Sequence, residues 1–378
     1  MSLKIDGLPA DLLLSNPQRL LIVRMNTVSD IMAGLPVLMA LRTRYPAAEI
    51  AWLVEDKSAS LLFGHTAQDR LIIARKGWLK SLDEVRLIRK RLQAFAPDVT
   101  IDLQSQFKSA FAAWLSGAKV RIGFGGNAGR EGSRWLNNVR VHADETHIIA
   151  RNLQLLHAIG ICGCSVEFDL PECETDRVTV TRIRRELSLE GNFAILNVGA
   201  NWESKRWRAE RFTELAKYLY DQWNLPSLIV GGSLEERDLA VRVAADSHGA
   251  AHLAPMMTLP ELAAMCRRAT MFVGSDTGPL HVAATVDTPC VGLFGPTNGL
   301  RSGPYGSRHR IVQVRRPNDS ELEPRDASNE WMNAIQLEHV TTACDEILTE
   351  ILVRSAAEST VRFPESDGTK SIIHRIGA

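Results

Sequence analysis

Short apolar runs alternate with longer amphipathic segments along most of the chain. This alternation is typical of βαβ units, so it predicts an α/β fold built on parallel sheets. In the first half we expect strands at Arg19–Arg24, Glu49–Val54, Arg70–Ala74, Val99–Leu103 and Lys119–Ile122. In the second half we expect strands at Phe193–Val198, Ser227–Val230, Ala250–Leu253, Met271–Val273 and Cys290–Leu293. Amphipathic segments such as Trp78–Phe95 and Phe107–Leu115 fill the gaps as helices.

The two series of strands indicate two similar doubly wound domains. We place the first domain at residues 1–172 and the second at 173–330, followed by a helix at 331–354 and a loosely ordered tail at 355–378. Ligands of open α/β sheets bind outside the carboxyl ends of the strands. The functional side chains should therefore follow strands and face a cleft between the two domains.

Composition narrows the class of protein further. Lys and Arg number 44, and so do Asp and Glu, so the net charge of zero argues against a dedicated nucleic-acid binder. No apolar run reaches the ~18 residues of a membrane span. The start of the chain, Met1–Gln18, has only a short apolar block and no secretory signal core. We therefore expect the protein in the cytoplasm.

The first expected strand leads into a polar turn and then into a helix that opens near Asp30. An aspartate at this place can cap the helix and interact favourably with its dipole. It can also face the cleft and act as a general base. The position alone leaves both roles open.

Two turns in the second half carry a charged side chain behind a strand. Lys205 offers a point charge suited to a phosphate, or it lies in a solvated basic loop. Glu235 and Glu236 follow two glycines that permit close approach of a ligand. One of them could accept hydrogen bonds from ribose hydroxyls, or both could simply stabilise the start of a helix.

The strongest turn is Asp276-Thr277-Gly278, which opens a helix that carries His281 about one turn in. The free N–H groups at a helix start form an anion site by geometry and dipole. His281 could bind a second phosphate or a hydroxyl, or it could be a buried structural residue. Together the three turns suit a nucleotide diphosphate. The chain has no Walker lysine, no Asp-x-Asp pair and no glycine-rich dinucleotide fingerprint, so we expect neither a metal nor a cofactor.

At these residues the chain resembles glycosyltransferase family 9, the ADP-heptose:lipopolysaccharide heptosyltransferases, over roughly residues 19–350. It looks most like the type that adds the first heptose to Kdo of lipid A. The motifs that carry the resemblance are Asn26-Thr-Val-Ser-Asp30, Lys205-Arg-Trp207, Asp276-Thr-Gly-Pro-Leu-His281, Phe294-Gly-Pro-Thr297 and Tyr305-Gly306. Ser29 stands where the family has a glycine.

The resemblance implies a GT-B fold, in which two facing Rossmann-like domains enclose a central cleft and the C-terminal helix often crosses back onto the N-terminal domain. It implies an inverting glycosyltransferase that moves heptose from ADP-heptose to Kdo of lipid A, with Asp30 as the catalytic base. The donor-binding positions that it implies are Ala200, Asn201, Lys205, Glu235 or Glu236, Met257, Asp276, Thr277, Gly278 and His281. Ala200 and Asn201 replace a pair of hydroxyl residues of the family.

An acceptor of this kind carries phosphates and carboxylates, so it calls for cations on the first domain. Arg75 and Lys76 follow the third expected strand, and Arg130 lies in the glycine-rich turn after the fifth. We expect these three at the mouth of the cleft, and Arg89, Lys90 and Arg91 on a solvated helix face. The acceptor would also bring the protein to the inner face of the inner membrane as a peripheral protein.

Other functions stay open at this point. A GT-B-type transferase could use a different nucleotide sugar or a different acceptor. A GT-B-like nucleotide-sugar epimerase or hydrolase would admit water in place of the acceptor sugar. A protein that keeps the nucleotide cleft without catalysis is a third alternative.

Overall fold

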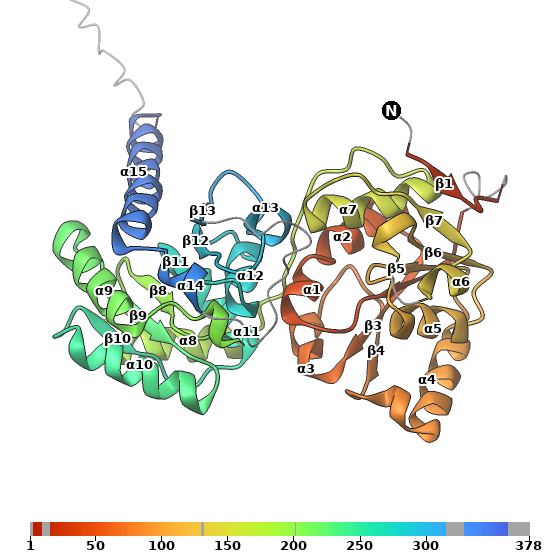
Figure 1. Cartoon of the computed structure of the whole chain (residues 1–378), viewed down its shortest axis with the longest axis horizontal. Helices are drawn as coiled ribbons and strands as arrows, with labels where there is room; N and C mark the ends of the chain where they lie inside the picture. Colours follow the sequence, from red (N-terminus) through yellow and green to blue (C-terminus); the bar gives the residue numbers. More distant parts are fainter. Residues whose placement is uncertain (1–2, 10–15, 130–131, 201, 315–328, 362–378) are drawn as a thin grey trace, which may run out of the picture.

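The computed structural model contains two α/β domains that lie side by side (Figure 1). The structure describes residues 3–9, 16–129, 132–200, 202–314 and 329–361. The first domain, from red to yellow in Figure 1, holds one sheet, and the second, from green to blue, holds the other. Residues 160–173, which connect them, contain no helix or strand.

The first sheet has seven strands in the order β1-β7-β6-β5-β2-β3-β4. They are β1 (Ile5–Asp6), β2 (Arg19–Val23), β3 (Glu49–Glu55), β4 (Arg70–Ala74), β5 (Val99–Asp102), β6 (Val120–Phe124) and β7 (Val139–Val141). β1 pairs with β7 antiparallel, and the other pairings are parallel. Without β1 this is the strand order of a Rossmann fold, which reverses between β2 and β5.

Helices cover both faces of this sheet. They are α1 (Val28–Met32), α2 (Leu35–Arg44), α3 (Asp56–Ala59), η2 (Ser60–Leu62), η3 (Trp78–Lys80), α4 (Leu82–Phe95), α5 (Phe107–Leu115), η4 (Gly126–Ala128), α6 (Ser133–Leu136), α7 (Ile148–Gln154) and η5 (Leu155–Ile159). Side chains alternate along β2, so Leu20 and Ile22 join one apolar cluster with α2 and α7. Leu21 and Val23 join another with α4 and α5.

The second sheet has six parallel strands in the order β10-β9-β8-β11-β12-β13. They are β8 (Ala194–Asn197), β9 (Ser227–Val230), β10 (Ala251–Leu253), β11 (Met271–Ser275), β12 (Cys290–Leu293) and β13 (Arg310–Val312). The helices are α8 (Glu174–Glu186), η6 (Glu203–Lys205), α9 (Ala209–Trp223), α10 (Leu234–Asp246), α11 (Leu259–Cys266), α12 (Gly278–Thr285), α13 (Gly299–Ser302), α14 (Glu330–Asn333) and α15 (Leu337–Val361). The Rossmann order recurs, with its reversal between β8 and β11.

The C-terminal helix differs from the sequence prediction in both place and length. The resemblance offered a crossing back onto the first domain, as is often seen in GT-B folds, but α15 packs on α9, β12 and β13 of the second. Its apolar residues Val340, Cys344 and Ile347 are buried in the core of that domain, which explains the placement. The helix continues to Val361, so the first part of the expected tail is helical. Residues 362–378 of that tail lie outside the described residues.

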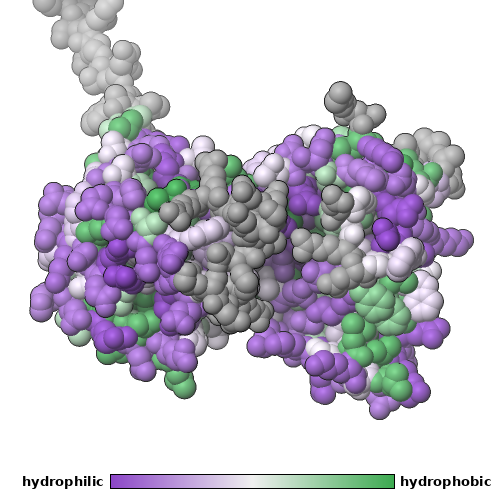
Figure 2. Space-filling model, viewed as in Figure 1, coloured by the Kyte–Doolittle hydropathy of each residue, from purple (hydrophilic) through white to green (hydrophobic). Residues whose placement is uncertain are grey.

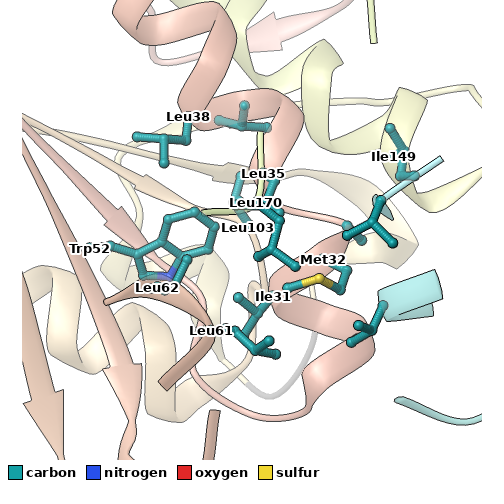
Figure 3. Close-up of a cluster of buried hydrophobic side chains, with 14 of the residues drawn as sticks. Ile31, Met32, Leu35, Leu38, Trp52, Leu61, Leu62, Leu103, Ile149 and Leu170 are labelled. Carbon is teal, nitrogen blue, oxygen red and sulfur yellow. The ribbon is translucent and has the colours of Figure 1, made fainter. Parts of the chain in front are cut away.

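One apolar cluster extends from the first domain into the second. It contains Ile31 and Met32 of α1 together with Leu262 and Leu280 of the second domain. Figure 3 shows the part of this cluster around Ile31, Met32 and Leu103. The short helix α1 is therefore anchored by buried side chains on one side while its other side remains available to the cleft.

Candidate active site

A cavity of about 2240 Å³ lies between the two domains. Its lining includes Asp30 and Lys108 of the first domain and Lys205, Asp276 and His281 of the second. Both points at which the strand order reverses, β2/β5 and β8/β11, open into it, as expected for α/β ligand sites. Small-molecule pockets usually measure ~300–1,000 Å³, so this cavity has room for two substrates.

Asp30 caps its helix and also lines the cavity. Thr27 caps α1, and its hydroxyl accepts a hydrogen bond from the Asp30 N–H at 3.2 Å. The Asp30 carboxylate returns the contact by accepting from the Thr27 N–H at 3.2 Å, which completes a capping box. The same carboxylate lines the cavity, with 27% of the side chain exposed. It is thus fixed in place by the helix cap and still open to a ligand.

Arg24 holds the other carboxylate oxygen of Asp30. Its Nη2 lies 2.5 Å from Asp30 Oδ1, and its Nη1 donates to the Leu103 carbonyl at the end of β5. The guanidinium is almost fully buried, and the Trp52 indole donates to the Arg24 carbonyl at 3.0 Å. This charged hydrogen bond fixes the orientation of the Asp30 carboxylate in the wall of the cavity.

The N-terminus of α12 meets α1 across the domain boundary. A Cβ on Gly278, the first residue of α12, would lie 3.0 Å from the Cβ of Val28 in α1. A glycine here permits the two helices to approach, because the opposite domain occupies the space of a side chain. This contact brings the N–H groups of a helix start close to the helix that carries Asp30.

Asp276 organises the polar residues around that helix start. Its carboxylate accepts from Lys205 Nζ at 2.7 Å, from the Thr297 hydroxyl at 2.8 Å and from His281 Nε2 at 3.0 Å. Burial by itself would raise the pKa of Asp276, but the His281 hydrogen bond and the Lys205 charge outweigh burial and hold the pKa far below its usual range. Asp276 is therefore an ionised anchor that positions Lys205 and His281 in the cavity wall.

Glu235 and Glu236, which the sequence could not separate, point in different directions. Glu236 lines the cavity and accepts hydrogen bonds from the N–H groups of Gly232 and Ser233 at 2.7 and 2.9 Å. Its carboxylate also fills the space beside Gly199, where a Cβ would come within 2.5 Å of it. Glu235 does not line the cavity, and 84% of its side chain is exposed.

Several predicted site residues do not reach the cavity. Ala200 is buried and Met257 packs against the apolar core, and neither lines the cavity. Arg75, expected at the cleft mouth, does not line the cavity either, because its 80% exposed side chain pairs with Glu84 of α4 at 3.3 Å. Lys76 does line it, as do Thr277 and Gly278. Asn201 and Arg130 lie outside the described residues.

The structure adds cations to those that we expected at the mouth of the cleft. Lys57, Lys80 and Lys108 line the cavity together with Lys76, and Lys108 forms an ion pair with the buried Glu55 at 2.8 Å. These lysines follow β3, β4 and β5, three strands that end at the same edge of the sheet. Their position behind neighbouring strands is the sequence signal that could have found them. We call Lys57, Lys76, Lys80 and Lys108 the lysine wall.

His147 links the two domains at the rim of the cavity. Its Nε2 donates to the Gly303 carbonyl at 2.9 Å, and its Nδ1 accepts from the Ile149 N–H at 3.2 Å. The ring also contacts Tyr305 edge-on, with 4.9 Å between centroids. Burial lowers the pKa of His147, and the nearby His281 adds to this effect while the bond to Gly303 opposes it. The two hydrogen bonds require the neutral ring, which agrees with the direction of the shift.

Two absences concern residues 3–9, 16–129, 132–200, 202–314 and 329–361. Those ranges hold no group of three or more His, Cys, Asp or Glu side chains placed to bind a metal ion. In the same part of the chain, no helix has both the length and the apolar character that crossing a membrane requires.

The model of glycosyltransferase family 9 (heptosyltransferase) matches residues 85–332. The chain belongs to glycosyltransferase family 9. It is therefore an enzyme of the heptosyltransferase family, and the predicted resemblance is confirmed. Membership favours a transferase over an epimerase, a hydrolase or an inactive binding protein.

Relatives in the family can be aligned with most of this heptosyltransferase. Lipopolysaccharide heptosyltransferase 1 of Pseudomonas aeruginosa is 29% identical over 298 residues, which cover 76% of this chain and 81% of that protein. Lipopolysaccharide heptosyltransferase 1 of Escherichia coli K12 is 26% identical over 310 residues, which cover 79% of this chain and 95% of that protein.

Solved structures share the fold. A family 9 glycosyltransferase from Veillonella parvula matches with a TM-score of 0.77 at 21% identity, covering 88% of this chain and 98% of that one. The E. coli heptosyltransferase WaaC with ADP-2-deoxy-2-fluoro heptose matches with a TM-score of 0.68 at 24% identity, covering 87% of this chain and 99% of that one. The predicted α/β GT-B fold, with two facing Rossmann-like domains, is confirmed.

Proposed function

We propose that this heptosyltransferase transfers heptose from ADP-heptose to Kdo of lipid A in the inner core of lipopolysaccharide, with Asp30 as the general base. The donor is supported by the E. coli WaaC structure with ADP-2-deoxy-2-fluoro heptose and by the similarity to lipopolysaccharide heptosyltransferases. The acceptor is supported by the lysine wall, since Kdo and lipid A carry carboxylate and phosphate groups.

The observation that carries the proposal is the contact between α1 and the N-terminus of α12 at Val28 and Gly278. Because of this contact, Asp30 and the N-terminus of α12 line the same cavity. In the proposal, that N-terminus binds the diphosphate of the donor. An acceptor hydroxyl near Asp30 would then face an anomeric carbon whose leaving diphosphate rests on the second domain. This is the arrangement that a single displacement with inversion requires.

In the proposed step, the Asp30 carboxylate takes the proton of the acceptor hydroxyl as the oxygen bonds to the anomeric carbon. The bond from that carbon to the diphosphate oxygen breaks on the opposite side, and ADP leaves with the electron pair. Lys205 and the N–H groups at the start of α12 stabilise the negative charge that develops on the diphosphate. Asp30 ends the step protonated and returns its proton to solvent.

The direct test supplies purified protein with ADP-heptose and a Kdo-bearing lipid A, and it measures ADP release together with the mass of the product. We expect a product heavier by one heptose. Parallel reactions contain UDP-sugars, or an acceptor without Kdo. Faster turnover with a UDP-sugar would contradict the proposed donor, and faster turnover without Kdo would contradict the proposed acceptor. Release of ADP without any acceptor would favour a hydrolase.

The two neighbouring glutamates provide a matched pair for the donor site. Glu236→Ala is expected to weaken ADP binding by about tenfold, because a carboxylate in the cavity wall loses its hydrogen bonds to the ribose. Glu235→Ala should bind ADP like the parent, since its side chain points into solvent. Titration calorimetry measures the ADP affinity of both variants. Equal affinities would show that Glu236 does not contact the ribose.

Arg75 and Lys76 provide a second matched pair, for the acceptor. Lys76→Ala is expected to raise the acceptor KM several-fold and to leave the donor KM unchanged, with a smaller effect at high salt. Arg75→Ala should change neither, because Arg75 pairs with Glu84 away from the cavity. Steady-state kinetics at two salt concentrations decides the point. A larger effect of Arg75→Ala would show that the acceptor approaches over α4 instead.

A further inference from the structure

Helix α5 carries a row of stacked aromatic side chains along its outer side. Phe107, Phe111 and Trp114 are spaced at i, i+4 and i+7, and each ring stacks on the next with 5.7 Å between centroids. Phe111 also stacks on the buried Trp78 at 6.4 Å, which fixes the row to the domain. We call Phe107, Phe111 and Trp114 the aromatic ladder.

The outer rings of the aromatic ladder remain in water. Phe107 is 47% exposed and Trp114 is 51% exposed. Trp135, on the adjoining helix α6, is 78% exposed. Figure 2 shows apolar surface on the side of the first domain where Figure 1 places α4 and α5. Contiguous exposed aromatic surface of this kind usually marks a binding surface.

The part of the chain that carries the aromatic ladder is rich in positive charge. Residues 75–142 hold thirteen Lys and Arg against five Asp and Glu, in a chain whose total charge is zero. Exposed cations on α4 include Arg86, Arg89 and Lys90, and the Arg134 guanidinium lies over the Trp135 ring at 5.2 Å. Aromatic rings bordered by Lys and Arg are typical of surfaces that bind at the headgroup level of anionic membranes.

The aromatic ladder adjoins the acceptor side of the cavity. Lys108 follows Phe107 directly in α5, and Lys80 lies two residues after Trp78 in η3. Both lysines line the cavity. A flat partner that contacts the ladder would therefore come to rest beside the lysine wall.

We propose that the aromatic ladder and its surrounding cations dock the first domain on an anionic lipid bilayer. The rings of Phe107 and Trp114 enter the boundary between headgroups and acyl chains, and the cations contact the headgroups. This binding belongs to the protein surface and needs neither substrate, so it goes beyond the proposed reaction. A second copy of the chain fits the face less well, because a symmetric contact would bring the same cations together.

Flotation of the full chain with vesicles tests the proposal without any acceptor. We expect binding to vesicles of phosphatidylglycerol and phosphatidylethanolamine, and far less to phosphatidylcholine alone. The double variant Phe107→Ser/Trp114→Ser should partition about tenfold more weakly for each ring removed. Tyr220→Ser, which removes a 45% exposed ring from α9 of the second domain, is the matched control and should bind like the parent.

Two further measurements keep the test decisive. The double variant should retain its melting temperature and its turnover of a water-soluble acceptor, since neither ring lines the cavity. If the double variant unfolds, Trp135→Ser replaces it, because that ring is the most exposed of the group. Equal vesicle binding of parent and variant overturns the proposal. It is also overturned if the parent forms a dimer that the substitutions dissociate.

Discussion

Asp30→Asn is expected to lower kcat by about 10²- to 10⁴-fold while leaving the affinity for ADP unchanged. The amide has nearly the same shape as the carboxylate but cannot take the proton of the acceptor hydroxyl. Its oxygen can still accept the hydrogen bond from the Thr27 N–H that completes the cap of α1. The substitution removes the base and keeps the cap of α1, but it also removes the counter-charge of the buried Arg24, so some loss of stability is expected. Single-turnover kinetics together with ADP calorimetry measures the two quantities separately.

The same variant distinguishes the two roles of Asp30. If the carboxylate only caps α1 and pairs with Arg24, Asp30→Asn loses stability and leaves turnover near that of the parent. If the carboxylate is also the base, turnover measured well below the melting temperature falls steeply in addition. A variant that turns over within a few-fold of the parent would remove Asp30 from the mechanism.

Asp276→Asn should be among the most destabilising single substitutions in the second domain. Lys205 and His281 both bond to this buried carboxylate, and a neutral amide leaves the Lys205 charge without its counter-charge. Breaking a buried ion pair in this way typically costs about 3–5 kcal/mol in the free energy of unfolding. Donor affinity should fall as well, because Lys205 and His281 lose the anchor that positions them. Urea unfolding and ADP calorimetry measure the two effects.

The difference in stability between the parent and Asp276→Asn should depend on pH, and the pKa of Asp276 gives its direction. The pKa of Asp276 is far lower in the folded chain than its ordinary value of 3.8, so the ionised carboxylate stabilises the fold at neutral pH. That stabilisation is lost as the pH falls below about 4 and through the folded-state pKa. The gap between parent and Asp276→Asn should therefore narrow in acid.

The matched control for this variant is Asp287→Asn. Its partner is Arg308, and 73% of the Asp287 side chain is exposed. This surface pair should contribute less than about 1 kcal/mol at any pH. Equal stability losses in Asp276→Asn and Asp287→Asn would contradict the anchoring role.

The sequence predicted the interior strands and longer helices well because burial imposes a clear pattern on them. α5 has the predicted bounds, and the strands β5 and β11 lie at their predicted positions. The strands β7 and β13 were missed, since each has three residues and includes an arginine, and so was the two-residue edge strand β1. Such short, partly polar strands carry too little apolar periodicity to be recognised.

Which side chain reaches the cavity was harder to predict than which loop does. We predicted from the sequence that both Arg75 and Lys76 lie at the mouth of the cleft, yet only Lys76 lines the cavity. Neighbouring residues point in different directions, and Glu84, nine positions along the chain, offers Arg75 a partner outside. The same reason separates Glu235 from Glu236, whose side chain folds back onto the Ser233 N–H. These choices depend on contacts between elements that spacing alone does not contain.

The apolar cluster that extends from α1 into the second domain ties the stability of the two halves together. Ile31 and Met32, labelled in Figure 3, belong to α1, which contacts α12, so they would lose part of their cover if the second domain unfolded alone. Partial unfolding is then unfavourable, because it loses burial in both halves. The chain should behave as one cooperative unit, and a nucleotide bound to the second domain also protects the first domain from heat and proteases.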